Sequence, residues 1–183
     1  MLIFCCLAFF CQTNVYAQKK YVINSANLKT NDTVLVFTPS GWNIESGKGT
    51  PALFLLHGWS GCWSDWSKKT DIQELSNKWG FIIITPDGFY NSWYLNNIDK
   101  NKMQWKTFFH NELYPMMVKE YGLVPEKTFI SGLSMGGHGA LSTFLDDVSK
   151  FRAAGSMSGV LYLPDSKRKD YQLSQVIGPY SEG

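Results

Sequence analysis

The sequence predicts a single α/β domain with a mostly parallel β-sheet and helices on both faces, and three observations indicate it. Short apolar runs alternate along the chain with segments of helical periodicity. Residues 52–56 are apolar at every position, which is typical of strands buried on both faces of a parallel sheet. Chemically unusual residues follow directly after three of these runs, where parallel sheets gather their functional groups.

The expected elements follow in a regular order. The expected strands are residues 21–23, 33–37, 52–56, 81–84, 128–131 and 153–157. The expected helices are residues 67–79, 103–121, 136–145 and a last one near 171–177. Asn31-Asp32 is the predicted turn between the first two strands, and residues 39–50 read as a loop. We find no repeat and no interdomain linker, so one domain is expected, with right-handed connections between parallel strands.

The first 17 residues are predicted to be a signal peptide. Residues 2–11 are almost wholly apolar but too few to span a bilayer as a helix, and cleavage is expected after Ala17. The mature domain, residues 18–183, would then be secreted or periplasmic. It would keep Cys62 alone of the 4 cysteines, so no intrachain disulfide is expected.

A G-x-S-x-G pentapeptide, Gly132 to Gly136, lies between the strand at 128–131 and the helix that follows. In that setting the central residue, Ser134, occupies a sharp strand-to-helix turn that exposes its hydroxyl. A structural turn is the alternative, but the surrounding pattern favours a catalytic nucleophile. A serine nucleophile needs a histidine base and an acid that orients it. The chain has three histidines, and only His138 follows Ser134.

Acyl transfer also needs two N–H donors directed at the oxyanion. We expect them to be the amide of Met135, which follows the nucleophile, and the amide of Trp59, in the His-Gly loop after residues 52–56. His57 is predicted to structure that loop rather than to act as a base. Asp87, at the end of the next strand, either contacts substrate or fixes its own loop, and the second role is favoured.

The remaining histidines and the charge pattern indicate no further chemistry. His138 is four residues past Ser134 on the same helix and is predicted to pack or cap, and His110 is predicted to be packed or exposed. No histidine or cysteine spacing suggests a metal, and no cofactor is expected. A net charge of +2 gives no sign of nucleic-acid binding, and the basic run at 167–169 reads as a solvated loop.

Several blocks together resemble a known family. They are LLHGWSG, PDG, NSWY, MQWKTFF, ISGLSMGGHGA and AAGSMSG, which run from about Val34 to Ser158. They resemble the esterase D family, also called the putative esterase family, which includes S-formylglutathione hydrolases, feruloyl and acetyl-xylan esterases and mycolyltransferases. The resemblance implies an α/β-hydrolase fold, Ser134 as the nucleophile, and the amides of Trp59 and Met135 as the oxyanion donors.

In that family the pattern continues with two more strands, one carrying the acid and the next carrying the histidine. This sequence ends at Gly183 before either, and Asp165 does not match that acid. We therefore expect a hydrolase fold lacking its last strands, encoded by a truncated gene or a partial gene model of a normal enzyme.

The leading functional prediction is a secreted serine carboxylesterase. It would hydrolyse carboxylic ester or thioester bonds through an acyl-enzyme on Ser134, with a small-molecule or carbohydrate-linked ester as substrate. An inactive remnant or binding module without the triad acid and histidine is the alternative, and a serine peptidase is a third, less favoured one. The sequence does not determine the substrate-binding residues or the oligomeric state.

Overall fold

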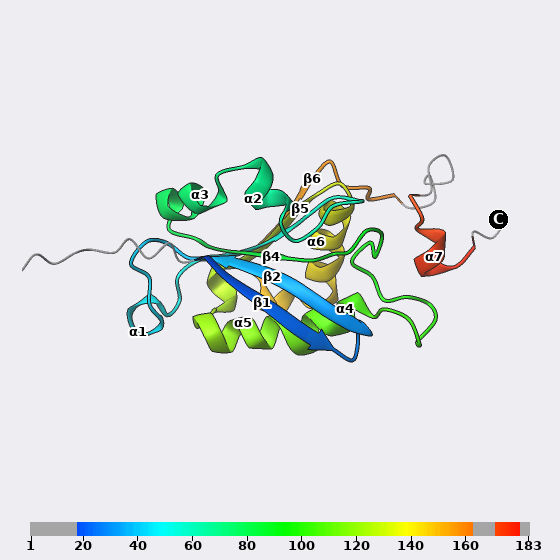
Figure 1. The fold of residues 1–183 in the computed structure, drawn as a ribbon, viewed down its shortest axis with the longest axis horizontal. Helices are drawn as coiled ribbons and strands as arrows, with labels where there is room; N and C mark the ends of the chain where they lie inside the picture. The colour runs from blue at the N-terminus through cyan, green and yellow to red at the C-terminus, as the bar shows by residue number, and fades with distance from the viewer. Residues whose placement is uncertain (1–17, 163–170, 180–183) are drawn as a thin grey trace, which may run out of the picture.

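The computed structural model describes residues 18–162 and 171–179, which form one sheet with helices on both sides (Figure 1). The sheet has six strands in the order β1-β2-β4-β3-β5-β6. They are β1 (Gln18–Ser25), β2 (Thr30–Phe37), β3 (Ala52–Leu56), β4 (Ile82–Pro86), β5 (Thr128–Leu133) and β6 (Ala153–Met157). β4, β3, β5 and β6 are parallel, whereas β2 pairs antiparallel with both β1 and β4. The predicted mostly parallel sheet is confirmed.

The helices lie on the two faces of this sheet, with α2 and α3 on one side and α4 and α5 on the other (Figure 1). The α-helices are α1 (Ile44–Gly47), α2 (Asp65–Lys69), α3 (Ile72–Trp79), α4 (Trp105–Phe108), α5 (Tyr114–Tyr121), α6 (Met135–Asp146) and α7 (Ser174–Ile177). A π-helix spans Phe109–Leu113, and 3₁₀ turns span Pro125–Lys127 and Val148–Lys150. The predicted signal peptide at 1–17, the basic run at 167–169 and Asp165 lie outside the described residues.

Burial on both faces explains why the central strands are continuously apolar. Phe54 and Leu56 point into the larger core, which includes α4, α5 and α6, whereas Leu55 between them joins a second cluster. That second cluster contains Ile72 of α3 and Ile83 of β4. Since neighbouring strand residues face opposite sides of a sheet, every position must be apolar when both sides are covered.

Two predicted helices are each divided in the structure. The one expected at 67–79 breaks at Thr70, which is extended, and Asp71 then caps α3 by accepting a hydrogen bond from the amide of Glu74. The one expected at 103–121 is a run of α4, the π-helix and α5. Pro115 lacks an N–H and cannot continue the regular ladder, and the wider π-turn ends at Leu113, two residues before it.

The predicted turn between the first two strands was misplaced. Asn31 and Asp32 belong to β2, and the turn lies at residues 26–29. The Ser25 hydroxyl accepts hydrogen bonds from the amides of Asn27 and Leu28, at 3.2 and 3.1 Å, and thereby stabilises the turn. These hydrogen bonds favour a turn at residues 26–29 rather than at Asn31-Asp32. In addition, the predicted loop at 39–50 contains the short helix α1.

The parallel pairing brings three sequence-distant loops to one edge of the sheet. β3 lies between β4 and β5, with Leu53 opposite both Ile83 and Phe129. The carboxyl ends of these strands lead into His57, Asp87 and Ser134 respectively. The predicted convergence of these strand ends is therefore observed.

Among the described residues no helix combines the length and the apolar character needed to cross a bilayer, and α6, the longest α-helix, has 12 residues.

Asp32 is a buried carboxyl beneath this edge. Its side chain is fully shielded from solvent, and Oδ1 accepts a hydrogen bond of 3.1 Å from the amide of Asp87. Oδ2 has no partner among the described residues. Burial, followed by the nearby charge of Asp87, raises the pKa of Asp32 well above its usual range.

This raised pKa predicts a specific pH dependence of stability. The folded protein holds the Asp32 proton more tightly than the unfolded chain, whose pKa is about 3.9. The contribution of Asp32 to the free energy of unfolding is therefore complete below about pH 3.9. It is lost as the pH rises through the pKa of the folded state, at up to about 1.4 kcal/mol per pH unit. We expect Asp32→Asn to flatten the decline in the free energy of unfolding above about pH 4, as measured by urea denaturation across a pH series.

Asp99→Asn is the matched control because Asp99 is an exposed carboxyl. It should leave the pH dependence close to that of the wild type. An unchanged slope in Asp32→Asn would contradict the assignment.

Candidate active site

Ser134 lies at the junction of β5 and α6, with φ 54° and ψ −114°. A positive φ is unfavourable for a residue with a side chain and costs about 1–3 kcal/mol. The strained turn leaves Ser134 half-buried at the cleft, with no hydrogen-bond partner for its hydroxyl among the described residues. The predicted strand-turn-helix setting of the G-x-S-x-G motif is thus present.

Two glycines of the motif are required by close backbone contacts. A Cβ on Gly136 would overlap the carbonyl oxygen of Leu56 and lie 2.5 Å from that of His57. A Cβ on Gly132 would overlap the backbone of Gly136 and lie 2.9 Å from Leu56 Cβ. The start of α6 is therefore packed directly against the end of β3, which only residues without a side chain permit.

Backbone hydrogen bonds hold the turn on both sides. The amide of Ser134 donates to the Met157 carbonyl at the end of β6, at 2.8 Å. The Ser134 carbonyl accepts from the amide of His138 at 3.0 Å, in the first turn of α6. Ser134 is thus fixed between an edge strand and a helix.

The two predicted oxyanion donors both have free N–H groups. Within residues 18–162 and 171–179 neither the amide of Met135 nor that of Trp59 has a hydrogen-bond acceptor. The loops that carry them touch, because a Cβ on Gly58 would lie 3.7 Å from Ser134 Cβ and 3.4 Å from the Leu133 carbonyl oxygen. The positive end of the α6 dipole is at the same place and favours negative charge.

His57 is buried and uses both ring nitrogens for structure. Nδ1 lies 2.8 Å from the Gly58 carbonyl oxygen, and Nε2 accepts a hydrogen bond of 2.7 Å from the amide of Gly88. A carbonyl can only accept and an amide can only donate, so the ring carries its proton on Nδ1 and is neutral. His57 has no free lone pair for the proton of Ser134, in agreement with its predicted role in structuring the loop.

The other two histidines are also packed. His138 donates from Nδ1 to the Val160 carbonyl at 3.0 Å, its ring lies against Trp93, and burial lowers its pKa. Burial, together with the charge of Lys150, also lowers the pKa of His110, which lies in the π-helix. Neither ring hydrogen-bonds to Ser134 among the described contacts.

Asp87 fixes its own loop. Its Oδ1 accepts a hydrogen bond from the amide of Phe89 at 2.7 Å, and its carbonyl accepts one from Trp105 Nε1 at 3.0 Å. Of the two roles left open by the sequence, the contacts support the structural one.

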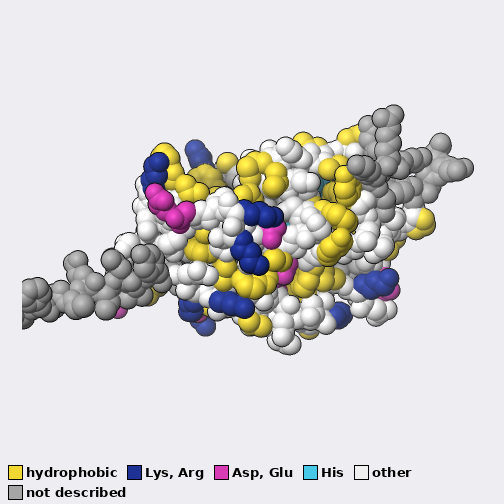
Figure 2. All heavy atoms as spheres, turned by 45° about the horizontal axis from the view of Figure 1, so that its top comes forward, with side chains coloured by type: hydrophobic (Ala, Val, Ile, Leu, Met, Phe, Trp, Pro, Cys, Tyr) yellow, Lys and Arg dark blue, Asp and Glu magenta, His cyan; other side chains and the backbone are white. Residues whose placement is uncertain are grey.

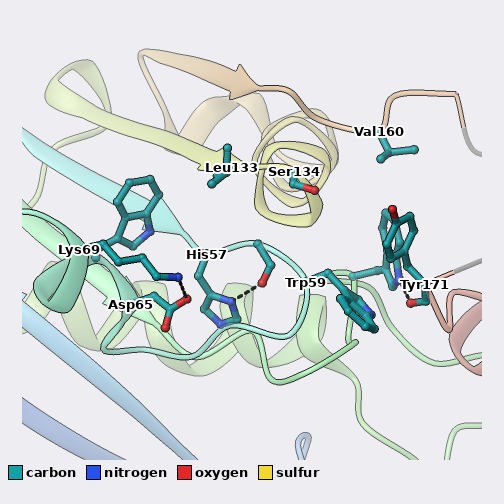
Figure 3. A pocket seen from close by; sticks show the side chains of 11 residues that line it. His57, Trp59, Asp65, Lys69, Leu133, Ser134, Val160 and Tyr171 are labelled. Atoms are coloured by element: carbon teal, nitrogen blue, oxygen red, sulfur yellow. Dashed lines mark hydrogen bonds and ion pairs between the residues drawn. The ribbon is translucent and has the colours of Figure 1, made fainter. Parts of the chain in front are cut away.

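A cleft of about 550 Å³ passes in front of Ser134 (Figure 3). At one end Asp65 and Lys69 of α2 form an ion pair of 2.7 Å beside Trp66. Burial acts to raise the pKa of Asp65, but the hydrogen bond and charge of Lys69 outweigh it and lower that pKa. At the other end the wall is aromatic. The rings of Trp59 and Tyr171 meet there edge to face, with 5.4 Å between their centroids.

The charged end of the cleft was not predicted from the sequence. Asp65 and Lys69 are four residues apart on α2, a spacing that places two side chains on one helix face, and this was the available signal. Tyr171 gave no such signal, because it reaches the cleft through long-range contacts of its segment. Its carbonyl accepts from Trp93 Nε1 at 3.1 Å.

The described residues contain no cluster of three or more side chains suited to a metal ion. On the face in Figure 2, Lys and Arg side chains are scattered among hydrophobic and acidic ones. That face offers no continuous basic surface of the kind that nucleic acids require.

Comparison with known proteins gives consistent matches. The family described as "Putative esterase" matches residues 25–176. An acetyl esterase of Caldicellulosiruptor saccharolyticus is 32% identical over 148 residues, which cover 76% of this chain and 54% of that protein. A solved ferulic acid esterase has a TM-score of 0.69 at 25% identity, over 78% of this chain and 57% of the other.

The fluorophosphonate-binding serine hydrolase FphF of Staphylococcus aureus has a TM-score of 0.79 at 23% identity, over 91% of this chain and 67% of its own. At that identity the likeness shows the fold, and the predicted α/β-hydrolase fold is confirmed. The chain spans about half the length of the acetyl esterase and the ferulic acid esterase.

The close contact at Gly136 predicts that Gly136→Ala is destabilising. The added methyl would meet backbone oxygens of β3 that cannot move aside, and we expect a loss of about 1–3 kcal/mol in the free energy of unfolding, measured by chemical denaturation. Gly155→Ala in β6 is the control, since its nearest contact is the flexible Ser131 hydroxyl at 3.2 Å. Equal effects of the two changes would contradict the packing argument.

Proposed function

Because the chain belongs to the putative esterase family, we propose that it is a serine carboxylic ester hydrolase whose nucleophile is Ser134. The single observation that carries the proposal is the strained turn of Ser134 against a loop with a free amide. Met135 and Trp59 supply the two oxyanion donors in this proposal.

In the reaction, Ser134 Oγ attacks the carbonyl carbon of the ester and gives up its proton. The carbonyl oxygen becomes an oxyanion, which accepts hydrogen bonds from the amides of Met135 and Trp59. The alcohol or thiol then leaves with a proton, and an acyl-enzyme on Ser134 remains. Water hydrolyses this intermediate and releases the carboxylic acid.

The general base for Ser134 is none of the three histidines. His57 has both nitrogens engaged, and neither His138 nor His110 bonds to the serine. We propose that a histidine outside this sequence, oriented by an acid, accepts the proton, as the family resemblance implies. The domain assignment, residues 18–183 as an incomplete esterase domain, is part of the same proposal.

Acylated carbohydrates are the proposed substrates. A cleft with aromatic rings at one end and an ion pair without net charge at the other suits a polyol, because rings pack on sugar faces and the pair both donates and accepts hydrogen bonds. The names of two similar proteins, an acetyl esterase and a ferulic acid esterase, support an ester of this class. Secretion, with a signal peptide cleaved after Ala17, is proposed with it and would bring the enzyme to extracellular esters.

An activated serine predicts covalent labelling. In the protein as its natural gene encodes it, a fluorophosphonate reagent should label Ser134 with one-to-one stoichiometry, measured by intact mass and peptide mapping. Ser134→Ala should abolish the label. Ser142→Ala, on the same helix with its hydroxyl bonded to the Gly139 carbonyl, should retain it. Absence of labelling in a folded sample would instead favour a non-catalytic remnant or binding module.

The charged end of the cleft predicts a substrate-dependent effect. Lys69→Met keeps the length of the side chain but removes its hydrogen bonds. KM for an acetylated oligosaccharide should rise about 2–10-fold, the value of one hydrogen bond, whereas KM for p-nitrophenyl acetate should not change. Lys78→Met in α3, outside the cleft, is the control. Equal changes for both esters would argue against a carbohydrate at this end.

A further inference from the structure

The loop after β3 carries the proposed oxyanion donor Trp59, and the direction of its N–H depends on the peptide bond between Gly58 and Trp59. In a trans peptide the carbonyl and the N–H point in opposite directions. The structure contains no cis peptide bond among its described residues. Whatever holds the Gly58 carbonyl therefore determines where the Trp59 N–H points.

Two donors hold the Gly58 carbonyl so that it points away from the Trp59 N–H of the same peptide. His57 Nδ1 lies 2.8 Å from the Gly58 oxygen, and the amide of Gly61 donates to the same oxygen at 3.1 Å. The loop closes tightly around them, because a Cβ on Gly61 would lie 2.8 Å from His57 Nδ1. The Trp59 N–H is left without an acceptor among the described residues.

The His57 ring is itself held in one tautomer. The amide of Gly88 donates to Nε2 at 2.7 Å, so the proton is on Nδ1, where the Gly58 carbonyl needs it. The Asp87 carboxylate lies 3.2 Å from Nε2, and the Tyr94 ring is 5.8 Å from the imidazole between centroids. With its proton on Nδ1, the ring has no hydrogen on Nε2 to donate to Asp87, and the Nε2 lone pair accepts from the Gly88 amide.

The two flanking peptides are anchored independently. The Tyr94 hydroxyl donates to the His57 carbonyl at 2.9 Å, and the amide of Ser60 donates to the Tyr90 carbonyl at 2.9 Å. The loop as a whole is thus fixed without His57. His57 adds the orientation of the Gly58–Trp59 peptide, which lies between these anchors. Because Gly58 has no side chain, its backbone tolerates more than one orientation of that peptide.

We propose that His57 is a positioning residue that directs the Trp59 N–H at the oxyanion, by holding the Gly58 carbonyl turned away from it. The proposal rests on the proposed oxyanion role of Trp59. Without the Nδ1 donor, among the described residues only the 3.1 Å bond from the Gly61 amide holds the Gly58 carbonyl, and the Gly58–Trp59 peptide can rotate and present that oxygen to the developing negative charge. Loss of one oxyanion donor lowers kcat about 10²–10³-fold.

The test compares His57→Leu with His57→Asn. Asn places an N–H donor at the position of Nδ1, whereas Leu fills similar space without one. In the protein encoded by the natural gene, His57→Leu should lower kcat about 10²–10³-fold with little change in KM, and His57→Asn should recover part of it. His110→Asn, which alters a half-buried histidine outside the cleft, is the control for general destabilisation.

Crystal structures of both variants give a readout that does not depend on activity. The Gly58 carbonyl should be rotated in His57→Leu and retained in His57→Asn. A folded His57→Leu with the wild-type peptide orientation would overturn the proposal. If the wild type shows no esterase activity, the proposed function fails, and the peptide orientation still decides whether His57 positions the amide.

A measurement on the wild type covers the case in which His57→Leu does not fold. Nitrogen-15 NMR of the imidazole should report the neutral ring with its proton on Nδ1, coupled through the hydrogen bond to Gly58. A ring with its proton on Nε2 would overturn the proposal, because it could not hold the Gly58 carbonyl.

Discussion

The direct backbone contact between the end of β3 and the start of α6 is the constraint on which the site depends. Gly136 meets the carbonyls of Leu56 and His57 with no space for a side chain. This contact brings the turn of Ser134 against the loop of Gly58, although the two are 76 positions apart in the chain. Parallel pairing of β3 with β5 sets the approximate distance, and the glycine sets the final approach.

Backbone strain is concentrated around the same cleft. Within the described part of the chain, three non-glycine residues with positive φ line it, namely Trp93, Ser134 and Tyr171. Five more of the described residues with positive φ lie within four residues of a lining residue in the chain, namely Ser60, Phe89, Tyr94, Ser158 and Gln172. Each such residue costs about 1–3 kcal/mol and persists only where its surroundings hold it. Here the surroundings are specific hydrogen bonds, such as that from Trp93 Nε1 to the Tyr171 carbonyl. The cleft is therefore a preorganised region that the regular sheet supports.

The histidines show why residue type alone is a poor guide to role. His57 adjoins the proposed nucleophile, yet its nitrogens are committed to Gly58 and Gly88. His138 is in the first turn after Ser134, yet its ring is committed to Val160. Both serve the architecture of the site. A buried imidazole whose two nitrogens both bond to the backbone is neutral and fixed in place. A catalytic base, in contrast, needs a free lone pair that faces the substrate.

The sequence by itself determined the strands, their mostly parallel sheet and the turn of Ser134, because those features follow from local apolar periodicity and from glycine at specific positions. It also indicated Trp59, Met135 and the structural role of His57, since strand ends converge in a parallel sheet. The splits of the helices follow from local signals, the Asp71 cap and Pro115, which the predicted helices did not take into account. Only the tertiary structure decided that the charged end at Lys69 and the wall at Tyr171 belong to one cleft. These depend on which distant side chains meet, and local pattern carries no information about such contacts.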